Sequence, residues 1–151
     1  MAPPTFSEYY FVARLMGADI VEVPQREYTH DLQAMIKAMT DKTKVIFLCN
    51  PNNPTGTWVS GAALEDFLQQ VPGHIVVVLD EAYYEYVQEP AYPNSLLWLE
   101  RFPNLIVTRT FSKVYGLAAL RIGYGIAHPH LIAILERVRE PFNVNSLAQT
   151  A

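Results

Sequence analysis

Hydrophobic positions along this chain follow two alternating patterns. Short runs rich in β-branched residues predict buried strands at residues 18–23, 44–49, 74–79, 104–109 and 121–127. Several of these runs are apolar at consecutive positions, which is typical of a parallel sheet covered by helices on both faces.

Helical periodicity separates the predicted strands. Apolar residues recur at i, i+3, i+4 and i+7 within residues 32–39, 64–71 and 131–138, and a further helix is predicted over 7–16. Asp31 is placed to cap the first of these helices, the second follows Ser60, and Pro141 ends the third. Strands that alternate with helices predict an α/β protein, here a three-layer α/β/α fold with a mostly parallel sheet.

Polar clusters follow three consecutive strands of this predicted sheet. They are "NPNNPTG" (50–56), "DEAYYEY" (80–86) and "TFSK" (110–113). Ligands of such sheets bind beyond the carboxyl ends of the strands, so three strand ends that deliver polar groups indicate a site there. The Pro-rich stretch "QEPAYPNS" (88–95) is predicted to be a surface loop.

Composition narrows the class of protein. The 151 residues fit one domain, and 50% hydrophobic with 17% charged residues indicates a globular chain. A net charge of −4 with scattered basic residues argues against a nucleic-acid partner. The single cysteine, Cys49, points to a reducing compartment. The N-terminus has no signal-peptide pattern and no apolar run could cross a membrane, so we expect a cytoplasmic protein.

Lys113 is the first candidate for chemistry. It follows a predicted strand in "RTFSKVYGLAALRIGYG" (109–125), where it has no acidic neighbour. Most lysines are simply surface residues, but one in this setting could attack an aldehyde as a nucleophile. Thr110, Ser112 and Arg121 add two hydroxyls and a guanidinium, the groups that hold a phosphate. A lysine for an aldehyde beside groups for a phosphate suggests pyridoxal phosphate.

Asp80, Asn53 and Tyr83 extend this hypothesis. Asp80 alone would be read as a helix cap or a strand-end acid, yet a carboxylate there could keep a pyridine nitrogen protonated. "NPNNPTG" is rich in turn residues, and its stiffness could also aim an asparagine amide at a ligand. The Asn53 amide and the Tyr83 phenol would suit hydrogen bonds to a ring hydroxyl.

Other motifs are weaker. "VVVLDEA" imitates the strand of nucleotide triphosphatases, but the chain contains no Gly-Lys pair for a phosphate loop. "HPH" (128–130) has no Cys or acidic partner at a usable spacing, so we predict no metal site and interpret it as a helix-entry loop. "GYG" (123–125) lacks the third glycine of a dinucleotide fingerprint and lies within a strand pattern.

In combination, "NPNNPTG", "DEAYYEY" and "RTFSKVYGLAALRIGYG" resemble the fold-type I pyridoxal-phosphate aminotransferases, and most of all their histidinol-phosphate aminotransferase branch. "PPTFSEYYFVARLMGADIVEVP" and "REPFNVNSLAQTA" are similar to that branch too, so the resemblance covers essentially the whole chain. It implies pyridoxal phosphate as cofactor and a homodimer as the assembly. It also implies amino transfer between amino-acid and keto-acid substrates, namely from histidinol phosphate to 2-oxoglutarate, giving imidazole-acetol phosphate and glutamate.

The resemblance also implies a role for each candidate. Lys113 would bond the cofactor aldehyde and then move the substrate proton, and Asp80 would pair with the pyridine nitrogen. The remaining cofactor contacts would be the ring hydroxyl with Asn53 and Tyr83, and the phosphate with Thr110, Ser112 and Arg121. Phe6 matches the aromatic residue that stacks on the ring, with plain core packing as the alternative.

The resemblance is to the central part of the family's large domain. We therefore expect residues 1–151 to be a single pyridoxal-phosphate-binding portion of that domain. The family's N-terminal segment, with its phosphate loop, and its small domain, with the arginine that grips the substrate carboxylate, would be absent from it. The alternatives are a truncated remnant or ligand-binding module without turnover, or another branch such as an aromatic aminotransferase or a threonine-phosphate decarboxylase.

Overall fold

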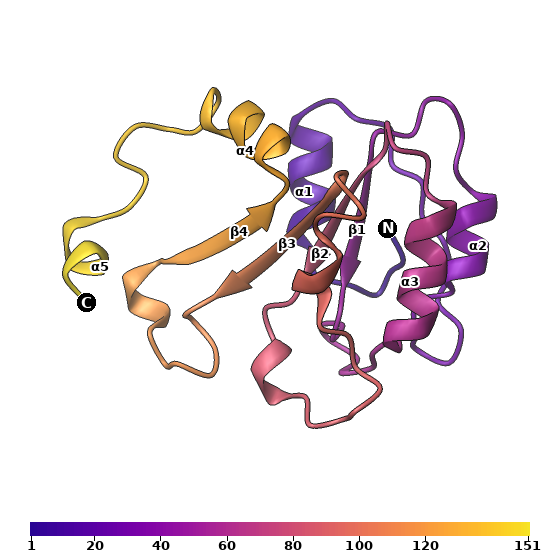
Figure 1. Ribbon diagram of the computed structural model, residues 1–151, viewed down its shortest axis with the longest axis horizontal. Coiled ribbons are helices and arrows are strands. Elements are labelled where there is room, and N and C mark those ends of the chain that lie inside the picture. The colour runs from indigo at the N-terminus through magenta and orange to yellow at the C-terminus, as the bar shows by residue number, and fades with distance from the viewer.

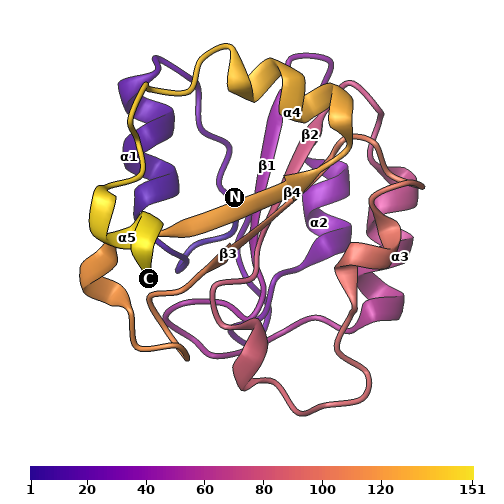
Figure 2. The same cartoon turned by 60° about the vertical axis from the view of Figure 1, so that its left-hand side comes forward.

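The computed structural model describes all residues from 1 to 151 as a four-stranded sheet with helices on both faces (Figures 1 and 2). The strands are β1 (Val45–Cys49), β2 (Val76–Asp80), β3 (Leu105–Thr110) and β4 (Gly123–Ala127). They lie in the order β1-β2-β3-β4; β1, β2 and β3 are parallel, and β4 runs antiparallel to β3. The mostly parallel sheet is therefore confirmed.

Helices form the outer layers. They are α1 (Glu8–Leu15), α2 (Leu32–Lys37), α3 (Gly61–Gln70), α4 (Pro129–Glu136) and α5 (Ser146–Thr150), with short 3-10 turns η1 (Tyr84–Tyr86), η2 (Ser95–Trp98) and η3 (Ala118–Leu120). Figure 2 shows α1 on one side of the sheet and α2 with α3 on the other, which confirms the three-layer architecture. No helix approaches the length needed to cross a membrane, since the longest, α3, has 10 residues.

Local signals in the sequence account for the helix starts. The Asp31 carboxylate accepts the Ala34 N–H at 2.9 Å and begins α2, and the Ser60 hydroxyl accepts the Ala63 N–H at 3.3 Å and begins α3. The predicted helix-entry loop at "HPH" is only partly right: His128 caps α4, its ring accepting the His130 N–H at 3.2 Å, while Pro129 and His130 already belong to the helix.

The hydrophobic core lies between the sheet and the layer of α2 and α3. Alternate residues of β1, β2 and β3 face it and are buried, as are the helix residues that oppose them. This cluster includes Ile46, Leu48, Val77, Leu79, Leu105, Val107, Leu64 and Phe67. The opposite face is only partly covered by α1, and Val45 at its edge is 46% exposed. The sheet thus buries one face of β1, β2 and β3, while β4 has no buried residue.

The strand predicted at residues 18–23 is not formed, and that prediction was wrong. The segment bonds to no strand: Ala18 N donates to Ala13 O at 2.9 Å, Met1 N donates to Val21 O at 3.1 Å, and Val23 N donates to Met1 O at 3.0 Å. A cavity of about 440 Å³ separates residues 18–23 from the outer edge of β1, and residues of both line it. An apolar run becomes a strand only when a neighbouring strand lies within hydrogen-bonding reach, and here none does.

Candidate active site

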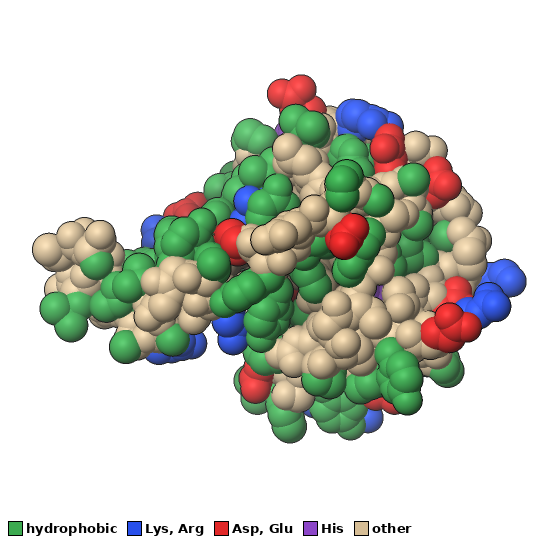
Figure 3. Space-filling model, turned by 90° about the horizontal axis from the view of Figure 1, so that it is seen from below, with side chains coloured by type: hydrophobic (Ala, Val, Ile, Leu, Met, Phe, Trp, Pro, Cys, Tyr) green, Lys and Arg blue, Asp and Glu red, His purple; other side chains and the backbone are tan.

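The polar clusters meet at one edge of the sheet. The parallel strands β1, β2 and β3 all end there and the antiparallel β4 begins there (Figure 1). Figure 3 looks onto this side of the molecule and shows mostly hydrophobic and uncharged side chains, with the charged ones mainly toward the rim. The hydrophobic and uncharged groups therefore make up most of this face.

The loop after β1 is held by two buried asparagines. The Asn50 side chain, 0% exposed, accepts the Val59 N–H at 2.9 Å and donates to Val59 O at 3.3 Å. Asn52 donates to Pro4 O at 2.9 Å from its own buried side chain. These bonds leave the partly exposed Asn53 to line a cavity of about 540 Å³ together with Tyr83 from the loop after β2. Two of the predicted cofactor residues are thus brought together.

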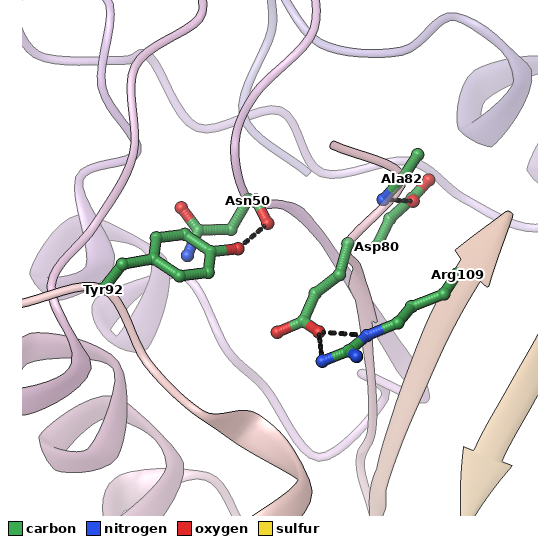
Figure 4. Close-up of polar contacts among 6 residues, drawn as sticks. Asn50, Asp80, Ala82, Tyr92 and Arg109 are labelled. Atoms are coloured by element: carbon green, nitrogen blue, oxygen red, sulfur yellow. Dashed lines mark hydrogen bonds and ion pairs between the residues drawn. The ribbon is translucent and has the colours of Figure 1, made fainter. Parts of the chain in front are cut away.

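Asp80 ends β2 on the face that α1 covers. Its Oδ2 accepts the Tyr9 hydroxyl at 2.5 Å. Figure 4 shows the second contact, in which its Oδ1 accepts the Ala82 N–H at 3.0 Å. The Tyr9 ring stacks on Phe47 with 4.8 Å between centroids, and Phe6 meets it edge-on at 5.5 Å. Burial, with the Asp80 charge adding to it, raises the pKa of Tyr9, so this phenol stays a donor. Phe6 therefore packs against the residue that orients Asp80.

The loop after β3 carries the lysine. Thr110 Oγ1 accepts the Ser112 N–H at 3.0 Å and donates to Ile122 O at 3.4 Å, which draws the start and end of the loop together. The exposed Lys113 points its Nζ at the Tyr83 ring, 5.2 Å from the centroid. The β2 and β3 loops thus bring Lys113, Tyr83 and the Thr110–Ser112 pair to one region.

Arg121 shares this edge, but its guanidinium is turned to its own turn. Its Nη1 donates to Ala118 O at 2.8 Å, and no hydrogen bond joins it to Thr110 or Ser112. Gly123 sets the start of β4 close to β3, because a Cβ there would lie 2.8 Å from Arg109 O. The backbone therefore delivers Arg121 to the site, while the side chain would have to rotate to meet a phosphate.

Sequence reasoning missed a buried ion pair beside the site. The Glu81 side chain, 0% exposed, accepts from Arg109 through Oε2, with Nε at 3.0 Å and Nη2 at 2.8 Å. Figure 4 shows Arg109 extending from β3 toward the chain beside Asp80. The sequence pattern that could have predicted this pair is an acidic residue directly after Asp80 and an arginine directly before Thr110, at the ends of neighbouring strands.

Burial and pairing act against each other in this pair. Burial raises the pKa of Glu81, while the Ser95 hydroxyl and the Arg109 guanidinium oppose that rise. Burial also disfavours the charged form of Arg109, but the hydrogen bonds and charge of Glu81 outweigh it and the pKa of Arg109 is raised. The two side chains form a mutually dependent unit at the end of β2 and β3.

The groups at this edge match the chemistry of a phosphorylated aromatic aldehyde. Lys113 supplies an amine, Asp80 a carboxylate for a ring N–H, and Thr110 with Ser112 a pair of hydroxyls. Asn53 and Tyr83 add an amide and a phenol on the wall of one cavity. The structure has no cluster of three His, Cys, Asp or Glu side chains that could hold a metal.

An α/β sheet with such groups at its carboxyl edge is typical of domains that bind small molecules. Residues 1–151 match the family described as aminotransferase class I and II, and the chain belongs to this family. It is 58% identical over 152 aligned residues to a histidinol-phosphate aminotransferase of Moorella thermoacetica, an alignment that covers 100% of this chain and 39% of that protein.

Solved structures agree with the fold. The histidinol-phosphate aminotransferase of Sinorhizobium meliloti, in complex with pyridoxal-5'-phosphate, superposes with a TM-score of 0.89 at 31% identity over 95% of this chain and 39% of that one. The L-threonine-O-3-phosphate decarboxylase of Porphyromonas gingivalis gives 0.82 at 27% identity over 97% of this chain and 42% of that one. The chain therefore spans about two fifths of the length of its relatives.

Proposed function

We propose that this chain is the cofactor-binding portion of a pyridoxal-phosphate-dependent aminotransferase. It would transfer the amino group of histidinol phosphate to 2-oxoglutarate, giving imidazole-acetol phosphate and glutamate. The observation that carries this proposal is the 58% identity to a histidinol-phosphate aminotransferase across the whole chain. The cofactor in the related Sinorhizobium meliloti structure supports the same chemistry.

Pyridoxal phosphate, when bound, supplies an electron sink for the carbon that loses its proton. The Lys113 amine would bond the aldehyde and then carry that proton, a role that suits its exposed position beside Tyr83. Asp80 would accept the pyridine N–H, and its orientation is already set by Tyr9 and Ala82. Phe6, 39% exposed, would cover one face of the ring.

The remaining contacts divide by the part of the cofactor that they would meet. Asn53 and Tyr83 would hydrogen-bond the ring hydroxyl from the wall of their shared cavity. Thr110 and Ser112 would hold the phosphate, joined by Arg121 once its guanidinium leaves Ala118 O.

The test of the cofactor assignment is covalent trapping. Pyridoxal phosphate is added to the chain, borohydride reduces the imine, and peptide mass spectrometry locates the modified lysine. We expect the label on Lys113, complete loss of that label in Lys113→Ala, and unchanged labelling in the control Lys37→Ala on α2. Labelling spread over other lysines, or retained in Lys113→Ala, would contradict the assignment.

The substrate is tested by glutamate formation from histidinol phosphate and 2-oxoglutarate in the protein at its full length. Phosphothreonine decarboxylation and aromatic amino-acid transfer are the matched alternatives. A higher kcat/KM with either alternative would assign the chain to another branch. Absence of turnover with all three substrates would favour a remnant or ligand-binding module.

Three further points belong to this proposal. We infer that residues 1–151 form one portion of the family's large domain. A homodimer is proposed as the assembly, and sedimentation of the full-length protein tests it. A cytoplasmic location is proposed, supported by the unpaired thiol of the buried Cys49.

A further inference from the structure

We propose that the buried Glu81–Arg109 ion pair is a positioning device that fixes the spacing between the ends of β2 and β3. This inference rests on the proposed function, because those two strand ends would hold opposite parts of one cofactor. Glu81 and Arg109 would act through their neighbours and not by contacting the cofactor.

The pair lies at the last point where the two strands run together. The backbone ladder ends with Glu81 N donating to Thr108 O at 2.9 Å, and the chains part beyond it. Glu81 follows Asp80 directly and Arg109 precedes Thr110 directly. Each partner is thus covalently joined to a residue of the proposed site.

Stability alone does not explain this pair. A fully buried carboxylate is costly, and replacing a buried ion pair by apolar side chains of similar volume is often neutral or stabilising. Here Glu81 Oε1 and the buried Ser95 Oγ make no hydrogen bond of regular geometry, so the desolvation of the carboxylate is incompletely offset. The pair therefore orients the two strand ends more than it stabilises the folded protein.

The orientation is set by the Arg109 guanidinium, which is held on two sides. Nε and Nη2 of Arg109 both donate to Glu81 Oε2, and the Arg109 Cζ lies 3.6 Å from the centroid of the Tyr84 ring. A planar fork held by an acid and an aromatic ring has little rotational freedom. The link therefore sets the separation of β2 and β3 within a narrow range.

The proposed cofactor residues divide between the two linked ends. Asp80 and Tyr83 belong to the β2 end, whereas Thr110, Ser112 and Lys113 belong to the β3 end. A displacement of about 1 Å between reacting groups can reduce a rate about 100-fold. A link beside both sets would keep the ring contacts and the phosphate contacts in register.

The inference is tested first in the protein without cofactor. The double variant Glu81→Leu/Arg109→Met keeps volume and removes the link. The matched control is Glu65→Leu/Arg101→Met. It removes an exposed ion pair that lies away from the site and has 2.7 Å between Arg101 Nη1 and Glu65 Oε1. Hydrogen exchange is followed at the Ala82 and Ser112 amides, each bonded to a strand-end side chain at 3.0 Å.

We expect exchange at both amides to rise about tenfold or more in the buried-pair variant only. The Val77 amide, bonded to Asn104 O at 2.9 Å at the other end of β2, should exchange as in the parent. Unchanged exchange at Ala82 and Ser112 in the folded variant would overturn the inference. If the double variant does not fold, Arg109→Lys takes its place. This variant keeps the charge without the guanidinium fork, so it should fold and give an intermediate increase in exchange at the Ala82 and Ser112 amides.

Binding of pyridoxal phosphate is the second measurement. We expect the buried-pair variant to bind at least about tenfold more weakly and to trap less label on Lys113, with the control pair at parent values. A folded buried-pair variant with parent affinity would overturn the inference. A parent chain that takes up no pyridoxal phosphate would instead refute the proposed function, and the exchange comparison would still decide the positioning role.

Discussion

Removing one hydroxyl, in Tyr9→Phe, should loosen Asp80 without disturbing the packing around it. The phenylalanine ring keeps the 4.8 Å stack on Phe47, so the buried apolar area hardly changes. What disappears is the donor that lies 2.5 Å from Asp80 Oδ2. The variant thus isolates a single hydrogen bond to a carboxylate.

The size of the effect follows from the surroundings of Asp80. A hydrogen bond to a charged group contributes about 1.5–3 kcal/mol. Asp80 is only partly buried and retains the Ala82 N–H at 3.0 Å, so water can replace part of the lost bond. We therefore expect Tyr9→Phe to lower the free energy of unfolding by about 1.5 kcal/mol.

Urea denaturation of Tyr9→Phe and Tyr10→Phe measures this difference. Tyr10 is the matched control, because it is 37% exposed and its hydroxyl meets only Arg14 Nε at 3.3 Å. Tyr10→Phe should change the free energy of unfolding by less than about 0.5 kcal/mol. The reasoning is refuted if both variants cost the same, or if Tyr9→Phe costs as much in an Asp80→Asn background as in the parent.

Three other predictions concern buried polar groups near the site. Burial lowers the pKa of His30, although the hydrogen bond to Cys49 O opposes this, so the folded state resists protonation. The free energy of unfolding should be highest above about pH 6.5 and should fall below that pH by up to about 1.4 kcal/mol per pH unit. Urea midpoints against pH measure this, and an equal slope in His30→Gln would contradict it. Asn50→Ala strands the Val59 N–H and C=O, and should cost at least about 2 kcal/mol in the same assay; a loss below about 1 kcal/mol would refute it. Burial and the nearby Asp80 charge raise the pKa of the Cys49 thiol to about 11. A thiol reagent near neutral pH should therefore label Cys49 at the rate of unfolding. Immediate labelling of the native protein would disprove this.

Sequence patterns predicted the parts of this structure that depend on local chemistry. Asp31 and Ser60 marked the starts of α2 and α3 because capping involves neighbours three residues away. The shared edge of Asn53 and Asp80 followed from parallel strands, whose carboxyl ends must lie together. Both conclusions required only short-range rules and one topological rule.

The features that sequence reasoning did not predict depend on partners distant in the chain. The bond between Tyr9 and Asp80 spans 71 positions, and the bonds between Arg109 and Glu81 span 28. Residues 18–23 have the composition of a strand but lie across a cavity from β1, which no periodicity within the segment reveals. The rotamer of Arg121, bonded to Ala118 O, is likewise a tertiary outcome.

The reversed direction of β4 has a consequence for the entropy of binding. Because β3 and β4 are antiparallel and Thr110 pairs with Gly123, the connection between them leaves and re-enters the sheet at one point. A loop whose ends are fixed side by side has lost part of its conformational freedom before any ligand arrives. Lys113 and Ser112, which this loop carries, have correspondingly less freedom to lose when they bind, so more of their contact energy would appear as affinity.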